Sequence, residues 1–190
     1  MVQFTISKSY KLWEMPDKVL TSDIIINKGV LLDIEHKIIV CTDGACMAIV
    51  PVNISNPDNI HEANIESNIV IPFNMFRICC NLCKEEYYTI SIDLEQKVCS
   101  FISKENTTIS MSLIPGAYPN VIRVISDSIK YLTGPPVDST IHAGMSIKLL
   151  NKLHKVLALN TDMPLGVTFT GKSTVGIVYS RGTTLDNKYG

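Results

Sequence analysis

The chain has 190 residues, of which 46% are apolar and 18% charged, with 17 basic residues against 18 acidic ones. That length is enough to bury a substantial core, and the near-neutral charge excludes a histone-like coat of positive charge but not a local basic face. Uncharged apolar runs, such as residues 24–26 and 70–73, fall far short of the roughly 20 residues that span a bilayer. Met1 and the residues after it lack the charged region and long apolar stretch of a secretory signal. We therefore expect a cytoplasmic protein with no membrane partner and with reduced cysteines.

Apolar and polar residues alternate along much of the chain, which predicts strands with one buried and one solvated face. Three hairpins follow from this alternation and from the short polar turns between the runs, and they lie at residues 29–40, 88–103 and 167–180. Hairpins joined by short turns are antiparallel, so most of the sheet is expected to be antiparallel.

Helical spacing of apolar residues predicts two helices and a weaker third. The first covers residues 74–84 with Asn74 as its N-cap, the second covers residues 145–159 with Ser146 as its cap, and the weaker one lies around residues 9–19. Each hairpin then follows a helix, which favours an α+β fold made by duplication of a βαβ-type unit. The alternative is an unrepeated α+β protein, since hairpins after helices are common in that class.

Three other segments have turn residues and no clear period. They are the linker candidate at residues 134–136, a loop at residues 53–68 and a polar tail at residues 183–190.

Catalytic motifs are weak or missing. Cys79, Cys80 and Cys83 crowd one short segment, but no second Cys-x-x-Cys completes a zinc site and the histidines are scattered. Cysteines on an apolar helix usually act as small hydrophobic side chains, and a metal or redox role is the alternative. The sequence has neither of the common glycine-rich phosphate-binding motifs. We therefore predict no enzyme activity, no catalytic residue and no cofactor.

The segment Thr42-Asp43-Gly44 lies between two apolar runs. Glycine supplies the positive φ that a tight turn needs, and an aspartate side chain can accept hydrogen bonds from the backbone nearby. This pattern by itself predicts a hairpin turn.

With its neighbours, this turn resembles the bacterial DNA polymerase III β sliding clamp family. Residues 29–34 and then 40–48 are similar to the family's apolar strand and its Ala-Thr-Asp-Gly-His-Arg-Leu-Ala signature. Residues 69–72 look like its Val-Ile-Pro-Arg segment, and residues 113–125 resemble its Phe-Pro-Asp-Tyr element. The chain departs from the family at three places: Ala45-Cys46 replaces His-Arg, Phe73 replaces the arginine, and residues 118–121 read Tyr-Pro-Asn-Val.

The resemblance implies a sliding-clamp fold with one clamp-like domain at residues 1–127, best matched over 23–127, and part of a second at 128–190. It implies a homo-oligomeric ring around duplex DNA, with basic helix residues facing phosphates in a sequence-independent way. The candidates are Lys148, Lys152 and Lys155, which fall in one row at helical spacing, together with Arg77 and Lys84. A solvated helix face is the alternative explanation of the lysine row.

The resemblance also implies an apolar cleft where a DNA polymerase or another replication protein docks a short peptide. Carried over by motif, the cleft residues are Thr42, Gly44, Ala45 and Met47, with Asn27 less securely matched. Met47 is equally well explained as a core residue. Two other functions remain open at this point: a clamp-fold interaction module or decoy that binds replication proteins without encircling DNA, and a cysteine-dependent metal or redox protein.

Overall fold

The computed structural model describes residues 1–16, 25–55, 69–120, 123, 146–158, 165–169 and 176–180. The chain divides into two compact units. The first contains Met1–Pro119 with Asn151–Ala158, and the second contains Asn120–Leu150 with Leu159–Gly190. The boundary predicted after residue 127 lies outside the described residues.

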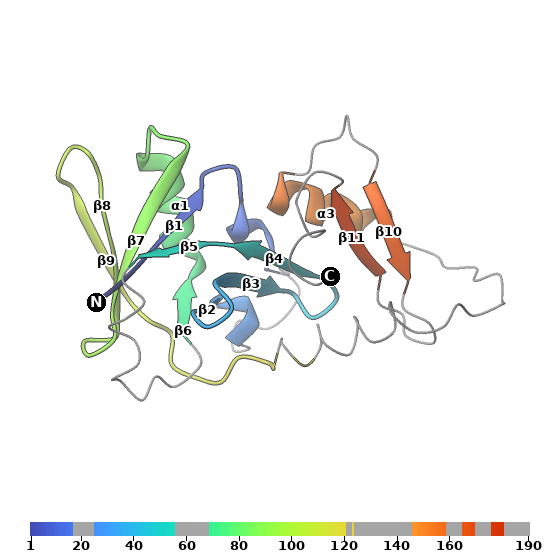
Figure 1. Ribbon diagram of the computed structural model, residues 1–190, viewed down its shortest axis with the longest axis horizontal. Helices are drawn as coiled ribbons and strands as arrows, with labels where there is room; N and C mark the ends of the chain where they lie inside the picture. The colour runs from blue at the N-terminus through green and yellow to red at the C-terminus, as the bar shows by residue number, and fades with distance from the viewer. Residues whose placement is uncertain are drawn as a thin grey trace. The chain divides into compact units, whose positions relative to one another are not determined.

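Two antiparallel sheets form the first unit (Figure 1). Sheet A has the order β5-β1-β7-β8-β9 and contains Asn53–Ser55, Val2–Ser7, Tyr87–Asp93, Val98–Ile102 and Thr108–Ser112. Sheet B has the order β4-β3-β2-β6 and contains Met47–Pro51, Ile38–Thr42, Gly29–Asp33 and Ile69–Pro72. The α+β class and the first two predicted hairpins, β2-β3 and β7-β8, are confirmed.

The first unit contains one structural repeat twice, and the two copies exchange their first strands. The first copy runs from β1 to the meander β2-β3-β4, and the second runs from β6 through helix α1 to the meander β7-β8-β9. β1 pairs with β7 of the second copy, and β6 pairs with β2 of the first. Each sheet therefore takes its first strand from the other copy.

Matching hydrogen bonds support the repeat. Lys37 and Lys97 end the two equivalent turns, and both have φ 54°. The carbonyl of Lys37 accepts from the N–H of Val52 at 2.9 Å, and the carbonyl of Lys97 accepts from the N–H of Leu113 at 2.8 Å. In both turns the aspartate that ends the preceding strand accepts a backbone N–H three residues later, at 3.0 Å. The predicted duplication is therefore visible in backbone geometry and in side-chain contacts.

Helix α1 (Phe73–Leu82) confirms the first predicted helix, but Asn74 is not its N-cap. Pro72 has the N-cap position, with φ −56° and ψ 137°, and no side chain caps the helix. Pro72 is the last residue of strand β6 and has an extended backbone, so the helix cannot include it. The helix therefore starts at Phe73, which puts Asn74 inside the first turn.

The weaker helix predicted around residues 9–19 is wrong for its described part. Only the 3₁₀-helix η1 (Leu12–Glu14) forms there. Pro16 follows closely, and a proline has no N–H with which to continue the helical hydrogen bonds. A second 3₁₀-helix, η2 (Ile25–Asn27), precedes β2.

The second main helix, α3 (Ile147–Leu157), lies inside the range predicted for it. Val156 is buried in the hydrophobic core of the first unit, and Leu153 and Leu157 pack against that core. The carbonyl of Val156 accepts a hydrogen bond from the N–H of Lys11 at 2.9 Å. The C-terminal half of α3 is therefore a structural part of the first unit.

In the second unit, the hairpin β10-β11 (Leu165–Phe169 and Gly176–Ser180) confirms the third predicted pair of strands. The turn, the linker candidate and the tail predicted from sequence lie outside the described residues, as does most of the predicted loop, whose first residues form β5. Within the described residues, no helix is long and apolar enough to cross a membrane.

Candidate functional site

The turn between β3 and β4 is held by its own side chains. Gly44 has φ 86°, which a glycine adopts without strain. The Thr42 hydroxyl accepts from the N–H of Gly44 at 3.0 Å and donates to the carbonyl of Cys46 at 2.7 Å. One carboxylate oxygen of Asp43 accepts from the N–H groups of Ala45 and Cys46, at 2.9 and 2.8 Å. The tight turn predicted from Thr42-Asp43-Gly44 is confirmed, and its backbone donors are satisfied from within.

The second carboxylate oxygen of Asp43 forms an ion pair with Lys152 of α3. The Asp43 side chain is only 2% exposed and the Lys152 side chain 18% exposed. The Lys152 ammonium also donates to the carbonyl of Met15 at 3.1 Å. Burial by itself raises the pKa of the Asp43 carboxyl, but the hydrogen bonds from Lys152, Cys46 and Ala45 outweigh burial and lower the pKa below its ordinary value.

The Asp43 carboxylate predicts an acid-dependent loss of stability. Because the folded-state pKa is lowered, the contribution of Asp43 is complete above the ordinary carboxyl pKa of about 4 and is lost as the pH falls through the folded value. Urea unfolding of the wild type and of Asp43→Asn should show a shallower decline of stability with acid in the variant. Glu35→Gln removes an exposed carboxylate and is the matched control. Equal slopes in Asp43→Asn and in the wild type would contradict the prediction.

The structure breaks the lysine row predicted on α3. Lys148 and Lys155 are exposed, whereas the Lys152 ammonium is engaged by Asp43 and Met15. The prediction of one continuous exposed row is therefore wrong at Lys152, because a buried carboxylate from the distant turn neutralises it. Lys148 and Lys155 remain available to a ligand.

The two basic residues predicted on and after α1 differ in their partners. Arg77 is an exposed residue of α1. Lys84 lies beyond the end of the helix and forms an ion pair with Glu105 at 2.9 Å. Both side chains of that pair are more than two thirds exposed, so the pair contributes little to stability and leaves Lys84 free to exchange partners.

The residues predicted to bind a partner peptide cluster at the β3-β4 turn. Thr42 is buried, Gly44 and Ala45 are exposed, and Met47 is half-buried at the start of β4. Asn27 ends η2, which lies against β2 and β3. A Cβ placed on Gly44 would lie 3.7 Å from the Cδ1 atom of Ile26, so η2 flanks the turn. The backbone thus brings the predicted residues together.

Tyr118 lies beside the same turn, and sequence reasoning did not assign it a role. It is buried, and burial raises the pKa of its hydroxyl, with smaller effects from Cys41 and the Thr42 backbone nearby. Within the described residues its hydroxyl has no hydrogen-bond partner of good geometry. The residue belongs to the segment that resembles the clamp family's Phe-Pro-Asp-Tyr element, which was the signal for its position.

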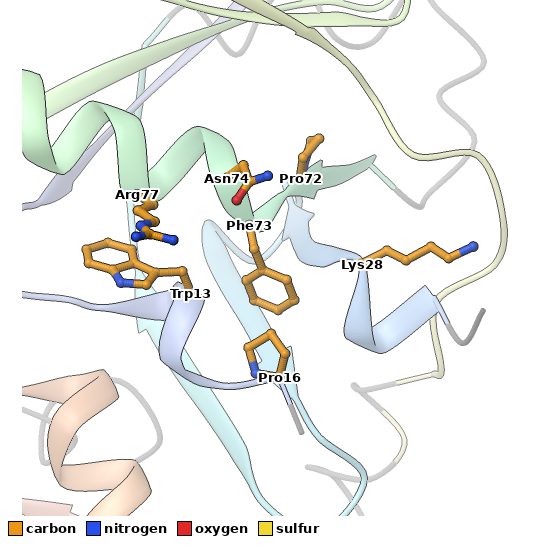
Figure 2. Close-up of a pocket in the computed structure, with 7 residues that line it drawn as sticks. All are labelled: Trp13, Pro16, Lys28, Pro72, Phe73, Asn74 and Arg77. Carbon is orange, nitrogen blue, oxygen red and sulfur yellow. The ribbon is translucent and has the colours of Figure 1, made fainter. Parts of the chain in front are cut away.

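A pocket of about 290 Å³ lies between η1 and the first turn of α1. Figure 2 shows Trp13 and Arg77 together on one side, Phe73 and Pro16 in the middle, and Lys28 extending on the other side. Asn74, which was predicted to be the N-cap of α1 but is not, also lines the pocket. The pocket's residues come from separate segments, so no short sequence pattern predicts it.

Cys79, Cys80 and Cys99 lack the environment of a reactive thiol. Burial is the main cause that raises the pKa of Cys79 to about 12 and of Cys99 to about 11, and it also raises the pKa of Cys80. Their thiols are therefore protonated near neutral pH, and a thiol is a poor nucleophile. Among the described residues, no cluster of three or more histidines, cysteines or carboxylates could hold a metal ion. The packing interpretation accounts for Cys79, which is fully buried in the core.

Comparison with known proteins finds likenesses among solved structures only. No family model matches the sequence and no curated protein matches it. The DNA polymerase III β subunit of Borrelia burgdorferi matches with 17% identity and a TM-score of 0.47, over 95% of this chain and 48% of that one. The β subunit of Thermotoga maritima matches with 15% identity and a TM-score of 0.42, over 79% and 37%. A Pseudomonas aeruginosa sliding clamp bound to griselimycin matches with 22% identity and a TM-score of 0.38, over 64% and 33%.

This chain spans about half or less of the length of these clamp subunits. The identities and TM-scores are low, so the description of this chain rests on its own topology and contacts.

Proposed function

We propose that this chain is a non-enzymatic, clamp-like protein that tethers partner proteins to DNA. The observation that carries the proposal is the duplicated strand-and-meander unit with exchanged first strands, with the Thr42-Asp43-Gly44 turn inside it. The order of the clamp-like sequence segments along the chain supports the same proposal. Tethering needs no reacting group, which fits the raised pKa values of the Cys79 and Cys99 thiols.

Duplex DNA is the proposed nucleic-acid partner, held through sequence-independent phosphate contacts in a homo-oligomeric ring. Lys148 and Lys155 are exposed on α3 and Arg77 is exposed on α1, so these three cations form the proposed contact set. Lys152 is left out because its charge is already paired with Asp43. Weak phosphate contacts of this kind allow sliding, and a ring would make retention topological.

Replication proteins are the proposed protein partners, bound through short peptides at the β3-β4 turn. Gly44 and Ala45 are exposed there, and the flexible thioether of Met47 suits a surface that accepts varied peptides. Tethering such a partner raises its effective concentration at DNA without new contacts to the nucleic acid.

A circular duplex tests the DNA proposal. We expect a discrete oligomer by light scattering, retained on closed circles and released when the circle is cut. The double variant Lys148→Glu/Lys155→Glu should bind more weakly, and its log–log salt dependence should fall by up to about 2 because each phosphate contact contributes roughly 0.9.

Lys104→Glu reverses an exposed charge outside the contact set and is the matched control. Unchanged binding by the double variant would remove both lysines from the DNA contact set. A protein that stays monomeric at high concentration would exclude the ring and favour a clamp-fold interaction module instead.

A further inference from the structure

The pocket between η1 and α1 combines a flat aromatic surface with positive charge. Trp13 is half-buried, so part of its indole ring remains accessible, while Phe73 is buried and forms the apolar floor with Pro16. Indole is a large π-surface on which a second ring can stack. The volume of about 290 Å³ lies near the lower end of the range for small-molecule sites, and a planar heterocycle fits such a space.

Two cations flank this surface. Arg77 and Lys28 are both exposed, and among the residues that the structure describes neither forms an ion pair. Among the described residues that line the pocket, none is a carboxylate. In Figure 2 the Arg77 guanidinium lies beside the Trp13 indole, and the Lys28 side chain lies on the opposite side and extends away from the other lining residues. The charge of the pocket is therefore complementary to an anion that carries an aromatic ring.

Asn74 adds a hydrogen-bonding group at the rim. It is exposed in the first turn of α1 and does not cap the helix, so its amide is free to donate and to accept. An amide of this kind can pair with the edge of a heterocyclic base, which also has donors and acceptors. A stacking ring, two cations and one amide are the groups that bind a nucleotide.

We propose that this pocket binds a nucleotide of single-stranded DNA, with the base stacked on Trp13 and the adjoining phosphates held by Arg77 and Lys28. The stacking surface is accessible to a base that has left a duplex, whereas paired bases are stacked within the helix. This inference rests on the proposed DNA-tethering function and adds to it a contact with unpaired strand.

Trp13 is the chain's one tryptophan, so its fluorescence reports on the pocket directly. We expect an oligothymidylate of about eight nucleotides to quench this fluorescence in the full-length protein. An abasic oligomer with the same number of phosphates should bind about tenfold more weakly, because it lacks the stacking ring. A duplex of the same length should leave the fluorescence nearly unchanged.

Variants assign the parts of the site. Trp13→Leu should weaken binding of a labelled oligothymidylate about tenfold, measured by anisotropy, while Trp13→Phe should retain part of it. Arg77→Gln should weaken binding and lower the log–log salt dependence by about 0.7, the contribution of one phosphate contact to a single strand. Lys104→Gln removes an exposed cation elsewhere and should change neither quantity.

Equal affinity for the abasic and the thymidylate oligomers, or binding without a change in Trp13 fluorescence, would overturn the proposal. Quenching by an acidic peptide but not by the oligothymidylate would assign the pocket to a protein partner and would overturn it as well. The retention of closed circular duplex is measured separately. If the protein is not retained on closed circles but still binds the oligothymidylate, the ring is contradicted and the nucleotide-binding proposal stands.

Discussion

Replacing Lys152 with methionine is expected to destabilise the first compact unit by about 3 kcal/mol. Methionine keeps most of the length and apolar volume of lysine but removes the ammonium. The Asp43 carboxylate, which is 2% exposed, then loses its ion-pair partner and retains only the N–H groups of Ala45 and Cys46. A buried charge without its counter-charge has no water to solvate it, which is the source of the cost.

A double-mutant cycle separates the pair from the rest of the site. Asp43→Asn is expected to cost a similar amount, because it leaves Lys152 with only the carbonyl of Met15. The double variant Asp43→Asn/Lys152→Met should lose less than the sum of the single changes, since neither charge is then left alone. Urea unfolding measures all three.

Lys155→Met is the matched control, because it makes the same change on an exposed position of the same helix. Its effect should lie within about 0.5 kcal/mol of zero. Strictly additive single effects would show that Asp43 and Lys152 do not interact in solution. That result would also mean that no ion pair holds α3 against the turn proposed to bind partners.

Phe76→Ala is expected to destabilise the first unit by about 4 kcal/mol. Phe76 on α1 and Phe4 on β1 are both fully buried, and their ring centroids are 6.5 Å apart at an interplanar angle of 42°. Truncation removes apolar contacts and leaves a cavity that the surrounding sheet closes only in part. The contact joins the first strand of one repeat to the helix of the other, so the loss tests the exchanged arrangement.

Leu82→Ala at the end of the same helix is the control. Leu82 is 43% exposed, so its truncation should cost less than about 1 kcal/mol. Chemical unfolding, followed by circular dichroism, measures both variants. Equal losses at the two positions would mean that Phe76 is not in the core and that β1 does not pack against α1.

Local patterns predicted the elements well where a short stretch decides the outcome. The alternation around Asp33 and Asp93 predicted both hairpins of the first unit, because period-two burial and the polar turn lie within a few residues. Helical spacing predicted an apolar side for α3, and on that side Leu153, Val156 and Leu157 contact the core, whereas Ile147 is 73% exposed. Near residue 74, two local signals compete, and Pro72 took the cap because strand β6 ends there.

The candidate site was predicted only in part. The sequence identified the Thr42–Gly44 turn from its residue types, and the structure gathers Thr42, Gly44, Ala45 and Met47 there. It treated Lys148, Lys152 and Lys155 as equivalent, since helical spacing contains no information about a carboxylate elsewhere in the chain. The pocket at Trp13 was missed for a related reason, because η1 and α1 are far apart in the sequence and come together only in the tertiary structure.

The sequence by itself determined the α+β class, the hairpins, the main helices, the tight turn at Asp43 and the resemblance to sliding clamps. Each of these depends on neighbours a few residues apart, whose geometry follows from backbone sterics and the burial of apolar side chains. Only the tertiary structure decided that Lys152 is an internal partner of Asp43 and that Trp13, Lys28 and Arg77 share one pocket. Those contacts join distant segments, and the folded chain alone determines which charges lose their water and which keep it.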